Sequence, residues 1–164
     1  MSEILIRPIA LADIAQFQRV TDAVMRERKY LAFIEGFPID EAALFVARNM
    51  RLRNPQIVAD HDSHIVGWCD IRRESIPVYT HTGHLGMGLL AQYRGQGLGE
   101  RLIRAAIEAA RQTGFERIEL SVYGRNAAAA TLYRKVGFVH EGTRVRGKKL
   151  DGEYDDVHMM GLLL

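Results

Sequence analysis

With 164 residues, 48% of them hydrophobic and 26% charged, the chain can bury one sizeable core and shows no sign of a second, so we expect a single domain over residues 1–164. The net charge of +2 is too small to indicate a nucleic-acid or membrane surface, and the lone Cys69 excludes an internal disulfide. The N-terminus lacks the pattern of a signal peptide and no apolar run approaches the roughly 18 residues of a membrane span, so we expect a cytoplasmic protein.

The N-terminal third predicts a strand followed by two helices. Residues 4–8 form a short apolar run that proline stops, and apolar side chains then recur at helical spacing over residues 10–29. Asp40 is expected to cap a second helix that ends near Arg51. The apolar segment between the helices, residues 30–38, is broken by Gly and Pro and is a candidate lid or pocket wall.

The middle of the chain predicts a hairpin, a strand and a long helix. Two strands, residues 56–59 and 63–71, are expected to be joined by a polar turn at residues 60–62. Residues 81–90 are expected to form a strand in spite of their glycines, and residues 98–112 a helix with one apolar face, which Thr113 and Gly114 end.

The C-terminal third predicts a strand, a helix and a closing hairpin. Residues 117–122 alternate as a half-buried strand, and residues 126–136 form a helix that Asn126 caps and Gly137 ends. A turn at Asp151 and Gly152 is expected to join two last strands. The fold class is therefore α/β (α+β), with a central mixed, mostly antiparallel sheet of about seven strands flanked by about four helices.

Three glycines, Gly95, Gly97 and Gly99, stand between the strand of residues 81–90 and the following helix. Free N–H groups and the positive end of the helix dipole favour an anion such as a phosphate at this place. A Walker loop is excluded because Gly99 is followed by Glu100 where lysine belongs, and a dinucleotide G-x-G-x-x-G pattern is excluded because its third glycine is missing.

Two motifs in this order resemble the GNAT superfamily of N-acetyltransferases. Arg94-x-x-Gly97-x-Gly99 is similar to the acyl-CoA pyrophosphate loop of that family, Gln/Arg-x-x-Gly-x-Gly/Ala. The segment from Asn126 to Phe138 is similar to its Asn-x-x-Ala-x-x-Leu-Tyr-x-x-x-Gly-Phe signature, and the order of elements accounts for nearly the whole chain. The resemblance implies a GNAT-like fold and an enzyme that moves an acetyl group from acetyl-CoA, its co-substrate, to a primary amine by direct attack in a ternary complex.

The resemblance also implies roles for residues of both motifs. Leu89 and Ala91 would pair their backbones with the pantetheine arm, as one strand pairs with another. Asn126 would contact that arm near its thiol end, with Ala129 small enough to let it pass. Tyr133 would protonate or hydrogen-bond the departing thiolate. The backbone amides that would hold the CoA pyrophosphate are those of Arg94, Gly95, Gln96, Gly97, Leu98, Gly99 and Glu100.

Simpler interpretations of the same residues stay open. Tyr133 shares helical spacing with apolar neighbours and fits a core aromatic, and Asn126 fits a plain helix cap. Glu119 could accept the proton that the amine loses, directly or through water, or could be an exposed strand charge. His81 and His84 are weaker candidates for that base.

No metal site is predicted. His61-x-x-His64 and His81-x-x-His84 each offer two nitrogens without a convincing third ligand. Cys69 alternates with Ile65 and Ile71 on one face of its strand and fits a small buried apolar residue. The thioester already activates the acyl group, so no protein nucleophile is needed. The basic run of Arg144, Arg146, Lys148 and Lys149 fits a solvated hairpin face.

The acceptor is less well specified by the sequence. The ending of the chain, with Asp151-Gly152-Glu153-Tyr154, resembles bacterial branches of the family that acetylate amino acids, amino-acid-like toxins, polyamines or protein N-termini. We expect an amino acid or another small amine first, and a protein N-terminus of the ribosomal-protein type second. A non-catalytic acyl-CoA-binding module and a nucleotide-binding protein are further alternatives. Because members of the resembled family commonly dimerise through a sheet edge, the resemblance also implies a homodimer.

Overall fold

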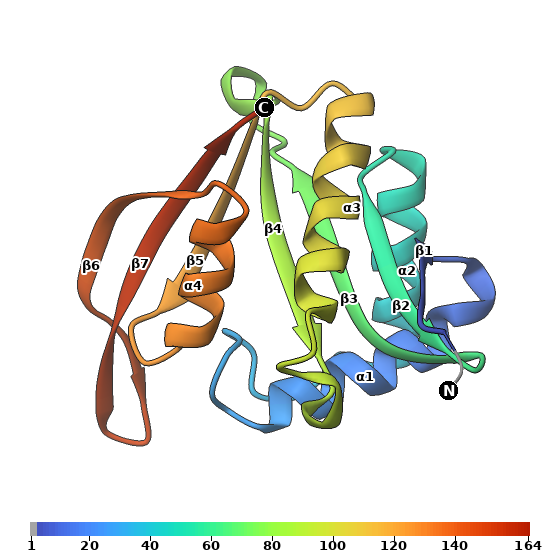
Figure 1. Ribbon diagram of the computed structural model, residues 1–164, viewed down its shortest axis with the longest axis horizontal. Coiled ribbons are helices and arrows are strands. Elements are labelled where there is room, and N and C mark those ends of the chain that lie inside the picture. The colour runs from blue at the N-terminus through green and yellow to red at the C-terminus, as the bar shows by residue number, and fades with distance from the viewer. Residues whose placement is uncertain (1–2) are drawn as a thin grey trace.

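The computed structural model describes residues 3–164, and their strands form one twisted sheet (Figure 1). The strand order is β1-β2-β3-β4-β5-β7-β6, and every neighbouring pair is antiparallel except β4 with β5. The predicted mixed, mostly antiparallel sheet is thus confirmed. The strands are β1 (Leu5–Pro8), β2 (Gln56–His61), β3 (His64–Arg73), β4 (Thr82–Leu89), β5 (Arg117–Tyr123), β6 (Val139–Leu150) and β7 (Glu153–Leu163).

Four α-helices cover the two faces of the sheet, in agreement with the predicted number (Figure 1). They are α1 (Ile14–Arg26), α2 (Ile39–Arg51), α3 (Leu98–Gln112) and α4 (Ala127–Lys135), with short 3-10 turns at Leu11–Asp13, Pro77–Tyr79 and Ala91–Tyr93. The apolar faces of α3 and α4 pack against one side of the sheet in the larger core, and α1 and α2 pack against the other side in a smaller core.

Strand β3 supplies side chains to both cores because successive residues point to opposite faces. Cys69 and Ile71 are fully buried toward α3, whereas Trp68 packs against Phe17 of α1 with the rings edge to face at 6.1 Å. The same alternation places Asp70 and Arg72 with Trp68 on the α1–α2 side, where all three line one cavity.

Strands β4 and β5 are paired over only three residues each, Thr82–His84 with Arg117–Glu119. Beyond His84 the two strands diverge, and the remaining residues of β4 pair with β3 alone (Figure 1). The edge of β4 that faces β5 is therefore left without a strand partner from Leu85 to Leu89. An unpaired strand edge of this kind offers backbone donors and acceptors to a ligand.

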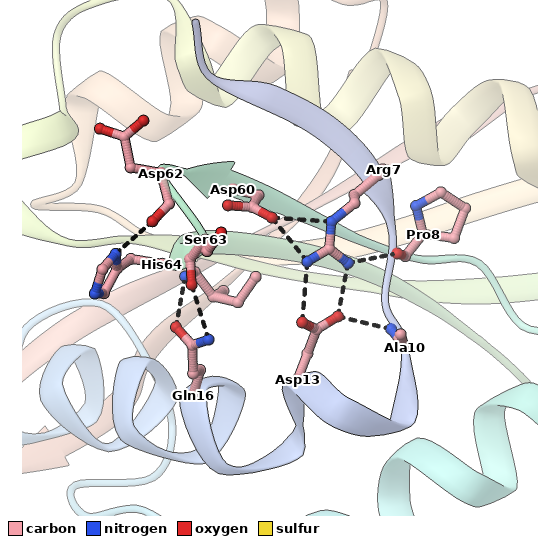
Figure 2. A network of polar contacts seen from close by, with 10 residues as sticks. Arg7, Pro8, Ala10, Asp13, Gln16, Asp60, Asp62, Ser63 and His64 are labelled. Carbon is pink, nitrogen blue, oxygen red and sulfur yellow. Dashed lines mark hydrogen bonds and ion pairs between the residues drawn. The ribbon is translucent and has the colours of Figure 1, made fainter. Parts of the chain in front are cut away.

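A partly buried arginine fixes the start of α1 to the sheet. Figure 2 shows the Arg7 guanidinium between two carboxylates: Asp13, which accepts from both terminal nitrogens at 2.7 and 2.9 Å, and Asp60 of β2, at 2.9 and 3.1 Å. Asp13 also accepts from the amide of Ala10 at 2.8 Å. Gln16 extends the network by bonding the backbone of Ser63 and Ile65 across the hairpin turn.

Two sequence predictions about local caps and turns are wrong. Asp40 does not cap α2: Pro38 occupies the N-cap position and Asp40 lies inside the first turn, where its charge favours the helix dipole. The β2–β3 turn lies at Asp62 and Ser63, both at positive φ, because β2 continues to His61 after a bulge between Ala59 and Asp60.

The other predicted ends are close to those observed. The helix of residues 98–112 has the expected bounds, and Gly114 follows it at φ +79°. Asn126 caps α4 by accepting from the amide of Ala129 at 3.2 Å, and Gly137 ends that helix at φ +108°. Asp151 and Gly152 form the last turn. Over residues 3–164 no helix has both the length and the apolar character needed to cross a bilayer.

Candidate active site

The glycine loop connects the end of β4 to the first turn of α3. Gly95 and Gly97 lie at φ +72° and +78°, in the left-handed region where a side chain is strained, although a Cβ there would meet no atom of the chain within 4 Å. The two glycines are thus required by the backbone conformation. Gly99 is different, since a Cβ there would lie 3.1 Å from Leu132 of α4, so this glycine allows α3 and α4 to approach.

The backbone amides of this loop point to an anion site. Among residues 3–164, no amide from Gly95 to Glu100 donates to a backbone carbonyl, and the first such bond of α3 runs from Arg101 to Gly97 at 3.3 Å. Six consecutive N–H groups are therefore available at the positive end of a helix of fifteen residues. The amide of Arg94 is not one of them, because it bonds the carbonyl of Ala91 at 3.2 Å.

The Arg94 side chain is turned into the protein. Its guanidinium donates to the carbonyl oxygen of Leu89 at 2.6 and 2.9 Å and forms a two-bond ion pair with Glu27, just after α1, at 2.5 and 2.9 Å. The ring of Tyr30 lies 4.8 Å from the same guanidinium. Hydrogen bonding to Arg94 lowers the pKa of Glu27. Arg94 thus links the glycine loop to the segment that precedes the apolar lid.

Helix α4 brings the residues of the second motif together. Asn126 and Ala129 lie in its first turn, and Tyr133 follows one turn later with 8% of its surface exposed. Tyr133 packs on Phe138, with ring centroids 5.9 Å apart, and belongs to the larger core. Burial, with the Cys69 thiol nearby, raises the pKa of Tyr133, so its hydroxyl keeps its proton at neutral pH.

Glu119 lies on β5 at the last residue pair before β4 and β5 diverge, opposite His84. Its carboxylate bonds Arg117 at 3.2 Å, and His84 Nδ1 lies 4.0 Å from it while the other ring nitrogen of His84 contacts Glu74 at 2.7 Å. Arg117 in turn pairs with Glu141. Glu119 therefore belongs to a charged cluster near the point where β4 and β5 diverge.

A cavity of about 400 Å³ opens beside the divergence, on the α1–α2 side of the sheet. Its apolar wall comes from α1, α2 and the lid segment of residues 30–38. The lid residues that line the cavity are Tyr30, Leu31, Ala32, Phe33 and Phe37, so the predicted pocket wall is observed. Its floor is formed by the sheet, including the unpaired part of β4 and the facing residues of β5. The floor residues are Trp68, Asp70, Arg72, Leu85, Gly86, Met87, Ser121 and Tyr123.

Asp70 and Arg72 are the charged residues of this floor, and the sequence interpretation missed both. The Asp70 side chain is only 6% exposed, and Arg72 Nε lies 3.0 Å from its Oδ1. Burial raises the pKa of Asp70 to about 6, against the opposing effect of Arg72. The signal in the sequence was an Asp inside an otherwise apolar strand, because Asp is rarely fully buried without a reason.

Metal ligands are not assembled in the described part of the chain: residues 3–164 contain no group of three or more His, Cys, Asp or Glu side chains arranged to hold a metal ion. His61 and His64 face each other across the β2–β3 turn, and His61 contacts Tyr93 at 2.9 Å. Cys69 is buried, and burial raises the pKa of its thiol.

Comparison with known proteins agrees with this geometry. Residues 18–138 match the Acetyltransferase (GNAT) family. The L-amino acid N-acetyltransferase AaaT of Escherichia coli (strain K12) is 33% identical over 106 residues, 64% of this chain and 65% of that enzyme, so the match spans just under two thirds of its length. An N-alpha-acetyltransferase of Sulfurisphaera tokodaii is 30% identical over 94% of this chain and 90% of its own.

Solved structures show the same fold. The crystal structure of an acetyltransferase of the GNAT family from Streptococcus pneumoniae is 30% identical and superposes with a TM-score of 0.93, covering 99% of this chain and 100% of that one. A phosphinothricin acetyltransferase of the GNAT superfamily from Sinorhizobium meliloti, solved in complex with acetyl-CoA, is 18% identical with a TM-score of 0.93, covering 100% of this chain and 89% of that one.

The chain belongs to the GNAT family of acetyltransferases, and it is an acyltransferase. The motif resemblance and the predicted enzyme class are therefore confirmed. The alternative of a non-catalytic acyl-CoA-binding module is therefore set aside.

Proposed function

We propose that the protein transfers the acetyl group of acetyl-CoA to the primary amine of a small molecule, with an amino acid as the first class of acceptor. The observation that carries this proposal is the arrangement at the unpaired edge of β4. The glycine loop, with six available amides, lies at the end of that edge, and the 400 Å³ cavity opens on its middle. A donor with an anionic tail and an acceptor of amino-acid size fit these two sites.

The proposed donor site uses the residues of the two motifs. The amides from Gly95 to Glu100 hold the pyrophosphate, while Arg94 acts through its side chain as a brace for the loop. Leu89 and Ala91 at the end of β4, with Asn126 and Ala129 on α4, border the pantetheine arm. Since both lone pairs of the Leu89 carbonyl accept from Arg94, the strand-like bonds to that arm come from other backbone groups of this edge.

In the proposed reaction the amine nitrogen attacks the thioester carbon, the new C–N bond forms and the C–S bond breaks. Tyr133 supplies a proton or a hydrogen bond to the departing sulfur, and burial, which raises its pKa, ensures that the hydroxyl carries the proton it would donate. The amine must lose a proton as it attacks. Glu119 is the base proposed from the sequence, and because its carboxylate is held by Arg117 outside the cavity, it would act through water.

A protein N-terminus is a second candidate acceptor, and one observation favours it. A further cavity of about 550 Å³ lies between the end of α1 and the β6–β7 hairpin, and Tyr30 lines both cavities. Charged groups of both signs line this second cavity, among them Arg28, Lys148 and Glu153. A peptide that entered the first cavity with its N-terminus would find polar partners for its following residues there.

Two measurements test the proposal. The first is thermal unfolding with acetyl-CoA, CoA, ATP and NAD at equal concentrations, because a ligand at about 100 times its dissociation constant adds about 2.7 kcal/mol of stability. Stabilisation by the two CoA compounds alone is expected, and stabilisation by ATP or NAD alone would contradict the donor assignment. The second is CoA release with the standard L-amino acids, spermidine and short peptides as acceptors. Amino acids are expected to give the fastest release, and release with peptides alone would favour the second candidate.

A homodimer and a cytoplasmic location remain predictions. Strand β6 lies at the edge of the sheet and exposes Val139 and Val145, which an edge-to-edge contact would cover. Light scattering on the purified protein tests the dimer, and a monomer mass at micromolar concentration would contradict it.

A further inference from the structure

Asp70 is a buried residue whose carboxylate is only partly hydrogen-bonded by its neighbours. Its side chain is 6% exposed, in the middle of β3. Arg72 Nε lies 3.0 Å from Oδ1, and Trp68 and Arg72 both act to lower the pKa of the carboxyl, but in the described part of the chain Oδ1 accepts no hydrogen bond of good geometry. A buried carboxylate oxygen that its neighbours satisfy only in part can accept a further donor from a ligand.

The strand opposite Asp70 leaves its carboxylate uncovered. Asp70 is paired with Gly86 of β4, and a Cβ at Gly86 would lie 3.6 Å from both carboxylate oxygens. Any larger residue at this position would cover the carboxylate from the β4 side. Asp70 and Gly86 line the 400 Å³ cavity together with Met87 of β4 and Ser121 of β5, so the carboxylate lies in the cavity that reaches the unpaired strand edge.

The charges around this cavity favour a cation beside Asp70. The helices contribute Phe17, Thr21, Met25, Ala42 and Phe45, and their one ionisable group in the lining is Glu41, a second acid. The other ionisable groups that line it are Tyr30 of the lid, Arg72 of β3 and Tyr123 of β5. His84, the register partner of Arg72, contacts Glu74. Arg72 is half exposed and keeps water as a partner when a ligand approaches Asp70.

We propose that Asp70 receives the ammonium group of the acceptor and takes the proton that its nitrogen loses during acetyl transfer. The inference rests on the proposed function and names its base. The bound ammonium first gives one proton to water, which leaves a neutral amine beside Asp70. The amine nitrogen then attacks the thioester carbon, its second proton moves to the Asp70 carboxylate as the C–N bond forms, the C–S bond breaks, and the thiolate gains a proton from Tyr133 or from water. Asp70 contacts the acceptor in the cavity, whereas Glu119 lies outside the cavity lining.

Asp70 also has a proton affinity suited to this step. Burial raises its pKa to about 6, so the carboxylate is ionised at pH 7 and accepts a proton more readily than an exposed Asp. Below about pH 6 Asp70 becomes protonated and can no longer accept a proton, so kcat/KM for the amine is expected to fall there. The amine itself titrates at higher pH, which separates the two effects.

The test compares Asp70→Asn with the wild-type enzyme, using acetyl-CoA and the amine that gives the fastest CoA release in the acceptor panel. The expected loss in kcat/KM for the amine is about 10²- to 10⁴-fold, and the fall below pH 6 disappears from what remains. Stabilisation of the variant by acetyl-CoA is expected to equal that of the wild type, which shows that the donor site is intact. A kcat/KM within threefold of the wild type, with the fall below pH 6 retained, would overturn the role of Asp70.

Two further variants make the result specific. Glu41→Gln removes the other acid of the cavity, and it is expected to keep the fall near pH 6. Gly86→Ala adds one methyl group 3.6 Å from the Asp70 oxygens, so it is expected to raise KM for the amine and to move the fall to higher pH. Should Asp70→Asn not fold, an unchanged pH profile in Gly86→Ala overturns the proposal instead. If the wild type releases no CoA with any amine, the proposed function itself is contradicted. A wild type that releases CoA while Asp70→Asn behaves like it contradicts only the role of Asp70.

Discussion

At the scale of single residues, two buried aspartates differ in what holds their charge. Asp13 accepts two hydrogen bonds from Arg7 and one from the Ala10 amide, and the bonding to Arg7 lowers its pKa. Asp70 has one ion pair, to a half-exposed arginine, and burial raises its pKa to about 6. The carboxylate of Asp13 is fully engaged in hydrogen bonds that hold the fold together. That of Asp70 is left with a partly satisfied oxygen in a cavity, which is what a binding group requires.

This difference predicts opposite effects on stability. The folded protein binds the Asp70 proton more tightly than the unfolded chain does, so the free energy of unfolding falls by about 2–3 kcal/mol from this group as pH rises from about 4 to about 6. Asp70→Asn removes this loss and is expected to unfold at a higher temperature than the wild type at pH 7. Calorimetry between pH 4 and 7 checks this, and a variant less stable than the wild type at pH 7 would contradict it.

Asp13 is expected to behave in the opposite way. Its lowered pKa contributes stability that is present above its unfolded pKa, near 4, and is lost as pH falls through the folded value. Arg7→Met leaves Asp13 and Asp60 without their common partner and is expected to cost about 3 kcal/mol at pH 7. Urea unfolding at pH 7 and pH 3 measures it. The cost is expected to shrink at pH 3, and an equal cost at both would assign it to packing alone.

At the scale of elements, the glycine loop shows that a motif can combine two physical requirements. Gly95 and Gly97 supply positive φ, while Gly99 lets helix α3 approach Leu132 of α4. Within residues 3–164, the amides of this loop from Gly95 onward stay without backbone acceptors up to the start of α3. The proposed anion site of this loop depends on backbone conformation, and the Arg94 side chain serves instead to bond the carbonyl of Leu89 and Glu27.

Gly97 and Gly114 form a matched pair for testing this loop, because they lie at the two ends of α3 with φ +78° and +79° and neither Cβ would meet an atom within 4 Å. Either change to Ala is expected to cost about 1 kcal/mol of stability from the left-handed backbone. Gly97→Ala is expected to weaken acetyl-CoA binding about tenfold or more, whereas Gly114→Ala leaves it unchanged. Calorimetric titration separates the two effects, and equal affinities would show that the loop does not contact the donor.

At the scale of the whole molecule, the two proposed substrate sites are joined by the ion pair of Arg94 with Glu27. Arg94 belongs to the glycine loop, and Glu27 directly precedes the segment that carries Tyr30 and the rest of the lid. A change at one site therefore reaches the other through a partly buried, two-bond contact.

A double-mutant cycle with Glu27→Gln and Arg94→Gln measures this link. The two changes are expected to be non-additive by about 1–2 kcal/mol in the free energy of unfolding, since each removes the same contact. Glu27→Gln, which lies outside the glycine loop, is also expected to raise KM for acetyl-CoA. Additive free energies together with an unchanged KM would show that the pair is a local surface contact only.

The sequence by itself determined the local features of this protein. Helix α3, the Asn126 cap and the Asp151–Gly152 turn follow from spacing and from residues that favour one backbone conformation, and these act within a few positions of the chain. The two motifs identified the family for the same reason. Where a local signal competed with strand pairing, as at the β2–β3 turn, the prediction was wrong because pairing with β3 extended β2 to His61.

Only the tertiary structure decided how distant residues meet. Asp70 lies opposite Gly86 because of the β3–β4 register, and Arg94 meets Glu27 across 67 positions because α1 packs near the end of β4. Glu119 shares a face of β5 with Ser121 and Tyr123, which line the cavity, but it lies at the paired end of the strand and outside that lining. The alternation of β3 marked Asp70 as unusual, but only packing against α1, α2 and the lid turned that face into a cavity. Register and layer packing are properties of the whole sheet, and no short segment encodes them.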